Sequence, residues 1–214
     1  MDLVVGEPPQ SLSMGTTNNL PLHQIRADYD RTTIVVYQAF RAEIAEPAVR
    51  AQRFVEPFSL NRMTWIKPSF LWLMGRSNWA RKPGQEHILA VRITRDGWET
   101  ALSQAVLTGY TRGVHADHAD WEQQMKHATV HVQWDPERTL AGAVLDARSI
   151  QVGLSRRVIA EYVNTWTTEI RDVTPTVRKM ADLLKQGRKD RAAEHLPKER
   201  PYELPPRIAQ RLYR

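Results

Sequence analysis

The chain has 214 residues, 42% of them hydrophobic, with seven tryptophans and no cysteine. This length suits one domain with short appendages, and the lack of cysteine excludes disulfides, thiolate nucleophiles and Cys-ligated metal centres. The net charge is +6, and residues 155–214 alone hold fourteen Lys and Arg against eight Asp and Glu. A basic excess of this kind suits an acidic partner such as nucleic acid, although it also serves solubility.

The two ends of the sequence differ in composition from its middle. Residues 1–22 are rich in Pro, Ser, Thr and Asn and predict a flexible arm, followed by one domain over residues 23–197. Residues 198–214 predict an extended basic tail of Pro and Arg. The N-terminus lacks the basic start and apolar core of a secretion signal, and no apolar run is long enough to span a bilayer. We therefore expect a cytoplasmic protein without a membrane partner.

The first predicted strand and helix lie between residues 32 and 53. Residues 32–37 are β-branched and apolar, which indicates a buried strand. Residues 41–53 have apolar positions at helical spacing, and Pro47 either delays or bends that helix. A strand over residues 62–66 then precedes a helix over residues 68–74, with a proline suited to its first turn.

The middle of the chain continues this mixture of strands and helices. Residues 86–94 alternate so that one face is fully apolar, which predicts a strand. Asp96 and Glu99 have the spacing of a capping box, which would open a helix reaching about Leu107. Residues 108–126 are polar and predict a long connection.

The last third predicts a hairpin and two helices. Residues 128–134 and 148–154 are strands joined by a turn-rich loop, and Ser155 caps a helix over residues 156–170. Thr174 and Pro175 open a final helix that Gly187 closes. Because strands and helices interleave without a strict βαβ rhythm, we expect an α+β fold: one compact domain with a mixed, largely antiparallel sheet flanked by helices.

The most informative stretch is the basic-aromatic segment, residues 62–86. Cations among aromatic rings are the usual means of binding nucleotides or single-stranded nucleic acid, and the backbone near Ser69 could receive an anion at a helix start. The alternative is that the tryptophans belong to the core and the cations to its rim. The segment holds Arg62, Lys67, Arg76, Arg81 and Lys82 among Trp65, Trp72 and Trp79.

Several stretches together resemble a known family. These are RMTWIKPSFLWLMGRSNWARKPGQEHILAVRI, IRADYDRTTIVVYQAF, VQWDPER and RSIQVGL. They resemble the family called domain of unknown function 4291, found in bacteria and fungi, from Ile25 to about Leu184. The resemblance implies no activity for individual residues.

The order of polar residues is also similar to the ADP-ribosyltransferase-like fold. A strand ends in Tyr37 and Gln38, and Ser69 and the pair Gln85–Glu86 follow. The resemblance implies NAD as cofactor and Glu86, Gln85 and Ser69 as catalytic residues, with the carboxylate stabilising an oxocarbenium-like charge. Three features depart from the pattern: Gln38 replaces the usual His or Arg, Ser69 precedes a helix, and Glu86 comes early. The cofactor-binding residues would be Tyr37, Gln38, Arg62, Lys67, Trp72 and Arg76.

Polar residues on the two hairpin strands form a candidate substrate site. They are Gln133, Asp135, Arg138, Arg148 and Gln151. Glutamines buried on strands need hydrogen-bond partners, and a ligand is one possible partner. The alternative is a structural Asp-Pro turn with a pair between Arg148 and Asp135.

Histidines in the polar connection invite comparison with a metal site. His115, Asp117 and His118 have a spacing that zinc and iron sites use, with His127 and His131 further on. The stretch is loop-like, however, and His-x-x-His matches are common. We predict no metal site.

Three functions follow in order of preference. The first is an enzyme acting on a nucleotide-type or nucleic-acid substrate, in its narrower form an ADP-ribosyltransferase-like transferase that uses NAD. The second is a non-catalytic nucleic-acid-binding module that uses the basic C-terminal helices and the tryptophan-rich segment. The third is a small-molecule enzyme of secondary metabolism, for which the sequence offers no specific sign.

Overall fold

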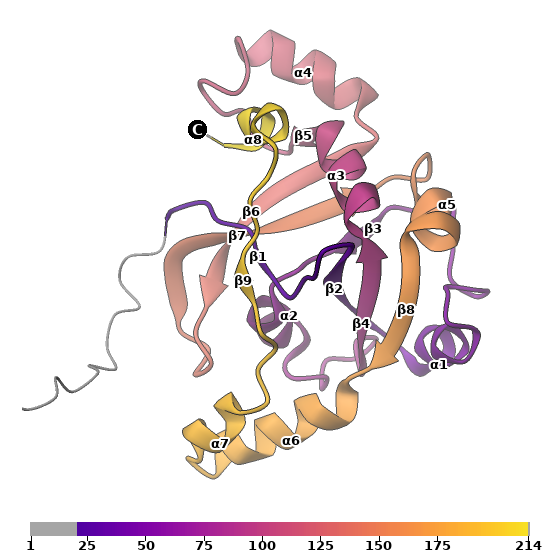
Figure 1. Cartoon of the computed structure of the whole chain (residues 1–214), viewed down its shortest axis with the longest axis vertical. Coiled ribbons are helices and arrows are strands. Elements are labelled where there is room, and N and C mark those ends of the chain that lie inside the picture. The colour runs from indigo at the N-terminus through magenta and orange to yellow at the C-terminus, as the bar shows by residue number, and fades with distance from the viewer. Residues whose placement is uncertain (1–20, 214) are drawn as a thin grey trace, which may run out of the picture.

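A computed structural model describes residues 21–213 (Figure 1). The predicted arm, apart from its last two residues, lies outside this range. The described chain is a single α+β domain, as predicted. Its helices are α1 (Ala42–Ala51), α2 (Phe70–Ser77), α3 (Arg95–Ser103), α4 (His118–His127), α5 (Ile159–Glu161), the π-helix η1 (Tyr162–Trp166), α6 (Thr174–Lys185), α7 (Lys189–Ala193) and α8 (Pro206–Leu212). Its strands are β1 (Arg26–Ala27), β2 (Thr33–Phe40), β3 (Thr64–Ile66), β4 (His87–Thr94), β5 (Ala105–Leu107), β6 (Val130–Arg138), β7 (Val144–Leu154), β8 (Thr167–Asp172) and β9 (Arg200–Pro201).

The strands form mixed, mostly antiparallel sheets, which confirms the predicted class. One sheet has the order β2-β4-β8, a second has the order β3-β7-β6-β5, and β1 pairs with β9. The parallel pair is β5 with β6. An isolated bridge between Tyr37 and Lys67 connects the first two sheets where β2 passes the end of β3. This junction positions the candidate site described below.

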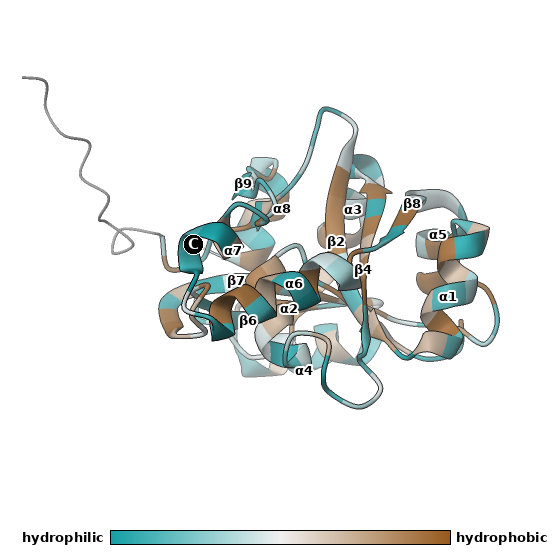
Figure 2. Cartoon of the chain, turned by 90° about the horizontal axis from the view of Figure 1, so that it is seen from below, coloured by the Kyte–Doolittle hydropathy of each residue, from teal (hydrophilic) through white to brown (hydrophobic). Residues whose placement is uncertain are grey.

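The core lies on both faces of the β2-β4-β8 sheet. β2 and β4 are hydrophobic along most of their length (Figure 2), and Val36, Leu89 and Val91 are fully buried. Their β-branched and aliphatic side chains suit a strand that is covered on both faces. Trp98 of α3 and Tyr162 of η1 fill the same core. Within residues 21–213 no helix is both long enough and apolar enough to cross a membrane.

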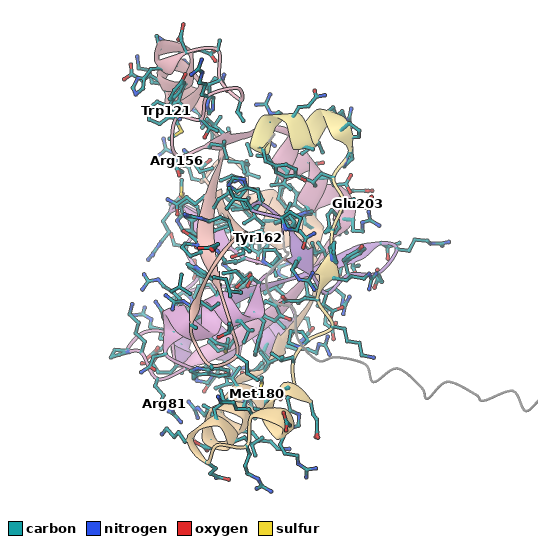
Figure 3. All side chains as sticks on the ribbon, turned by 90° about the vertical axis from the view of Figure 1, so that its left-hand side faces the viewer. Arg81, Trp121, Arg156, Tyr162, Met180 and Glu203 are labelled. Carbon is teal, nitrogen blue, oxygen red and sulfur yellow. The ribbon has the colours of Figure 1, made fainter. Side chains whose placement is uncertain are left out.

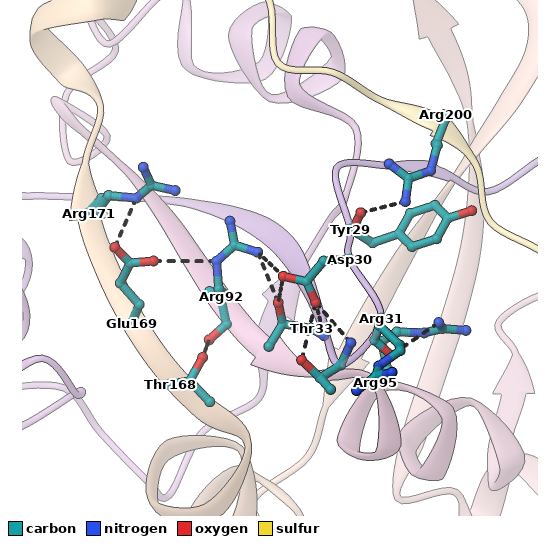
Figure 4. A network of polar contacts seen from close by, with 11 residues as sticks. Tyr29, Asp30, Arg31, Thr33, Arg92, Arg95, Thr168, Glu169, Arg171 and Arg200 are labelled. Atoms are coloured by element: carbon teal, nitrogen blue, oxygen red, sulfur yellow. Dashed lines mark hydrogen bonds and ion pairs between the residues drawn. The ribbon is translucent and has the colours of Figure 1, made fainter.

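A network of hydrogen bonds and ion pairs connects the strands of the β2-β4-β8 sheet (Figure 4). The Asp30 carboxylate accepts hydrogen bonds from the backbone N–H groups of Thr32 and Thr33, at 2.9 and 2.7 Å. These bonds hold the pKa of Asp30 below its usual range. Arg92 of β4 pairs with both Asp30 and Glu169 of β8, each at 3.3 Å. The network therefore ties the chain before β2 to the other two strands.

Helix α2 shows how local sequence sets an element. Ser69 caps it, because its Oγ accepts a hydrogen bond from the Trp72 N–H at 3.3 Å. The helix ends at Ser77, since Asn78 and the next two residues all have positive φ. Trp79 therefore lies outside α2 and does not share a helical face with Trp72.

Three predicted elements were wrong. The helix predicted over residues 156–170 is only the short α5 and η1, and β8 follows, because β-branched residues pair along β4. The connection over residues 108–126 contains all of α4 except its last residue, and Asp117 caps this helix by accepting from the Asp120 N–H at 2.8 Å. Strand β6 runs through Asp135 and Pro136 instead of ending there.

Two further boundaries differ from the prediction. Thr94, not Asp96, caps α3, and its Oγ1 accepts from the Gly97 N–H at 3.1 Å. The helix ends at Ser103, because Ala105 already begins β5. The last predicted helix is confirmed as α6.

The C-terminal segment is integrated into the fold instead of extending from it. β9 pairs with β1, and Tyr202, Leu204, Ile208 and Leu212 are buried. Trp134 of β6 donates its indole N–H to the carbonyl of Leu212 at 3.0 Å. The final residues thus cover the second sheet and α3.

Candidate functional site

A cavity of about 610 Å³ opens at the junction of the two main sheets. Its wall comes from the second half of β2, the loop over residues 57–63, β3 and α2. The volume falls in the range of small-molecule sites, roughly 300–1,000 Å³. The charged and aromatic side chains that line it are Tyr37, Phe40, Arg41, Phe58, Arg62, Trp65, Lys67, Trp72 and Arg76.

Lys67 occupies the link between β3 and α2. Its carbonyl accepts a hydrogen bond from the Tyr37 N–H at 2.7 Å, so its backbone is fixed by the sheet junction. Its side chain is 2% exposed, and its Nζ donates to Asp135 Oδ2 at 3.0 Å. The same Nζ lies 3.8 Å from the ring centre of Trp72, a cation–π contact.

The buried ammonium of Lys67 is electrostatically unusual. Burial lowers its pKa to about 8, while Asp135 and Glu137 act in the opposite direction. An ammonium group has three N–H donors, and within the described part of the chain only Asp135 accepts one of them. The side chain also lines the cavity, and its remaining donors have no acceptor among the described residues.

Gln38 lines the cavity, and its side chain connects β2 to β3 and η1. Its Nε2 donates to Thr64 Oγ1 at 2.8 Å and to the Trp65 carbonyl at 3.0 Å. Its Oε1 accepts from the Tyr162 hydroxyl at 2.6 Å, and burial raises the pKa of Tyr162, which keeps this hydroxyl protonated. Both amide donors are therefore used inside the protein, and Gln38 holds β2 against β3.

The mouth of the cavity is positively charged. Arg41, Arg62 and Arg76 line it and are exposed. Among residues 21–213, no Asp or Glu lines the cavity. Arg41 also lies 3.6 Å from Glu43 and Lys67 is paired with Asp135, so Arg62 and Arg76 are the lining cations without an ion pair among the described residues. Unpaired cations in a hollow with aromatic walls favour an anionic ligand.

The structure brings together most of the predicted cofactor and substrate residues. Gln151 Nε2 donates to Gln133 Oε1 at 3.4 Å across the β6–β7 pair, and Asp135 contacts the cavity through Lys67. Asp135 thus pairs with Lys67, and the alternative pair with Arg148 is not formed. The predicted residues that line the cavity are Tyr37, Gln38, Arg62, Lys67, Trp72, Arg76, Gln85 and Gln151.

Besides Gln133 and Asp135, four more predicted residues lie apart from the cavity lining. Glu86 Oε1 accepts from the Gly84 N–H at 2.8 Å, and this bond lowers the pKa of Glu86. Ser69 donates its hydroxyl to Glu137 at 2.8 Å. Arg138 lies directly over Gly75 of α2, and Arg148 is exposed on β7. The structure therefore places Gln85, but not Glu86, at the cavity.

Comparison with known proteins identifies the family. A family model described as Domain of unknown function (DUF4291) matches residues 24–202. The chain belongs to this family. The matched range contains every residue that lines the cavity, so the cavity is part of the DUF4291 domain. No curated protein and no solved structure matches the chain. The likeness to ADP-ribosyltransferases therefore has no support beyond the residue order.

Two sets of site residues in the DUF4291 domain were not predicted. Arg41 follows directly after β2, the strand that holds Tyr37 and Gln38. Its position at the end of this strand could have indicated a place in the site. Glu137 and Glu199 hold the α2 start through Ser69 and Phe70, and nothing local in the sequence indicates these contacts.

Glu199 links the C-terminal segment to the site. Its Oε1 accepts a hydrogen bond from the Phe70 N–H, at 2.7 Å, in the first turn of α2. Burial raises the pKa of Glu199 to about 8, despite that hydrogen bond. The folded chain therefore holds a proton that the unfolded chain releases above its ordinary pKa.

Glu199 predicts a pH dependence of stability. Because its folded pKa is raised, its contribution is complete at pH 4.5 and is lost as the pH rises to about 8. We expect the free energy of unfolding of Glu199→Gln, which keeps a hydrogen-bond acceptor, to fall less than that of the wild type between pH 5 and 8. The two losses should differ by about 1 kcal/mol or more. Urea denaturation at several pH values measures this difference. The exposed Glu203→Gln is the control, and a wild-type slope in Glu199→Gln would disprove the assignment.

The histidines of the DUF4291 domain are dispersed. His115 is buried, and its Nδ1 accepts from the Thr111 N–H at 3.1 Å, while His118 lies 3.4 Å from Glu122 on α4. His131 lies on β6. Within the described range no three His, Asp or Glu side chains are grouped as metal ligands.

Proposed function

We propose that this DUF4291 protein is an enzyme that acts on a nucleotide-type substrate bound in the cavity. The observation that carries the proposal is the lining itself. Four cations, Arg41, Arg62, Lys67 and Arg76, line one hollow with aromatic walls, and none of the described lining residues is acidic. A nucleotide supplies the matching parts, since its phosphates are anionic and its base is a flat aromatic group.

Each side chain has a chemical role in the proposed complex. Phosphate oxygens accept from the free N–H groups of Lys67, and arginine holds phosphate through two parallel bonds from its planar guanidinium. Trp65 and Trp72, both half-buried in the lining, provide aromatic surface for the base. NAD is one substrate with these features, because its pyrophosphate carries the negative charge that the arginines match.

Lys67 is the residue best suited to chemistry. Its pKa of about 8 leaves roughly one-tenth of the amine neutral at pH 7, so the group can both donate and accept a proton. Asp135, at 3.0 Å, orients the amine. A perturbed pKa with a specific charged partner in a cavity is typical of a functional group. The reaction class we propose is group transfer to or from the nucleotide.

The arginines at the mouth provide the first test. We expect Arg62→Gln combined with Arg76→Gln to weaken ATP and NAD binding at least tenfold, because each charged hydrogen bond contributes about 1.5–3 kcal/mol. Isothermal titration calorimetry at low salt measures the affinity. Arg207→Gln on α8 removes an exposed charge elsewhere and should leave the affinity unchanged. Equal affinities for the double variant and the wild type would refute the proposed ligand class.

A further inference from the structure

A second hollow, of about 460 Å³, lies between the end of α2, the β6–β7 hairpin and helices α6 and α7. It shares no lining residue with the cavity. Its lining includes Trp79, Arg81, Leu140, Leu184, Lys185 and Lys189. Figure 3 shows Arg81 at the end of the molecule formed by α6 and α7, far from Arg156. We call this hollow the Trp79 hollow.

The backbone at Trp79 is held in an uncommon conformation. Asn78, Trp79 and Ala80 have φ values of 50°, 54° and 61°, a run of left-handed residues without glycine. Two backbone bonds fix the run: Trp79 N–H to Met74 at 2.9 Å and Lys82 N–H to Ser77 at 3.0 Å. Strain of this kind is retained where the surrounding structure enforces it, and it clusters at binding sites. Here it brings the half-buried indole to the wall of the hollow.

The charged side chains that line the Trp79 hollow are all positive among the described residues. Lys185 at the end of α6 and Lys189 at the start of α7 are exposed, and neither forms an ion pair with any residue that the structure describes. Arg81 pairs with Asp182 at 3.0 Å, and both side chains are largely exposed. The two leucines give the hollow an apolar side beside the indole. The hollow thus combines the Trp79 ring, the apolar side chains of Leu140 and Leu184, and the unpaired cations of Lys185 and Lys189.

We propose that the Trp79 hollow binds single-stranded nucleic acid, with a base stacked on Trp79 and backbone phosphates on Lys185 and Lys189. Stacking platforms beside cations bind single strands with little sequence preference, because every base has a π-face. A duplex keeps its bases stacked on one another and cannot offer one to Trp79. This site is separate from the proposed nucleotide cavity, and it gives the basic excess of the C-terminal region a specific partner.

Binding of fluorescein-labelled 12-mer single-stranded RNA and DNA tests the proposal by anisotropy over a series of salt concentrations. Trp79→Ala should weaken binding roughly 5- to 150-fold, as expected for one lost stacking contact. Lys185→Gln with Lys189→Gln should lower the slope of log K against log salt by about 1.4, since each phosphate contact to a single strand contributes about 0.7. Trp79→Phe should retain most of the affinity.

The control is Arg156→Gln with Arg157→Gln, which removes two exposed cations away from the hollow and should change neither value. Circular dichroism melting checks that each variant is folded; the lysine pair is exposed and tests the proposal even if Trp79→Ala unfolds. Unchanged affinity and slope in the lysine variant would overturn the proposal. So would preferential binding of a 12-mer duplex, or of vesicles of anionic lipid, at the same residues.

Discussion

Replacing Lys67 with methionine is expected to weaken binding of ATP and NAD by roughly 10- to 150-fold, because a charged hydrogen bond to phosphate contributes about 1.5–3 kcal/mol. Turnover of either nucleotide, followed by phosphorus NMR, should be lost. Lys67→Arg keeps a positive charge that does not titrate, so it should retain more binding than Lys67→Met while still failing to turn over. Lys67→Met with wild-type binding and turnover would remove Lys67 from the mechanism.

Folding should survive the Lys67→Met change. Methionine fills a similar volume, and Asp135 keeps 26% of its side chain exposed and can remain hydrated. Because the pKa of Lys67 is lowered from 10.5 to about 8, its folded form binds fewer protons than the unfolded chain between these values. Wild-type stability should therefore gain a contribution as the pH rises from 8 to 10.5, and Lys67→Met should lack it. Urea denaturation of both proteins across this range separates a folding defect from a binding defect.

Gly97→Ala is expected to cause the largest loss of stability among the substitutions considered. Gly97 is buried in α3, and a Cβ at this position would lie 2.3 Å from Cγ of Trp166 in η1. Neither the indole nor the helix backbone can move freely in the core, and overpacking of this kind costs about 1–3 kcal/mol, occasionally more. The melting midpoint should fall by roughly 2–4 °C for each kcal/mol.

Gly109→Ala is the matched control for Gly97→Ala. A Cβ on Gly109 would meet no atom within 4 Å, so the substitution should change stability by less than about 0.5 kcal/mol. Thermal and urea denaturation of both variants measure the difference. If Gly97→Ala were as stable as Gly109→Ala, the close packing of α3 on η1 would be incorrect.

The fold class followed from sequence because several elements carry strong local signals. β2 and β4 have eight residues each, most of them β-branched or apolar, and the start of α2 has a serine cap. β8 was missed because the predicted helix was carried on to residue 170, although the β-branched residues from 167 onward favour a strand, and pairing with β4, distant in sequence, decides the outcome. Local propensity is a weak guide where such tertiary pairing competes with it.

The candidate site was partly predictable because several of its residues are close together in the sequence. Lys67, Trp72 and Arg76 are close in sequence, so one strand–helix link places all three at one cavity. The partner of Asp135 depends on the β3-β7-β6 order of the second sheet, and this order leaves no mark in the local sequence. Glu86 adjoins Gln85 of the lining, yet its carboxylate turns to the Gly84 N–H. The spacing of residues in the sequence could not decide whether Gln85 or Glu86 faces the cavity.

The central claim is that the cavity holds a phosphate-bearing nucleotide through its cations. Thermal denaturation of the wild type with ATP, ADP and adenosine at pH 7 and low salt tests this claim most directly, because a ligand that binds only the folded state raises the melting midpoint. We expect ATP and ADP to raise the midpoint and adenosine at the same concentration to leave it unchanged. Equal shifts with adenosine, or no shift with either nucleotide, would contradict the claim.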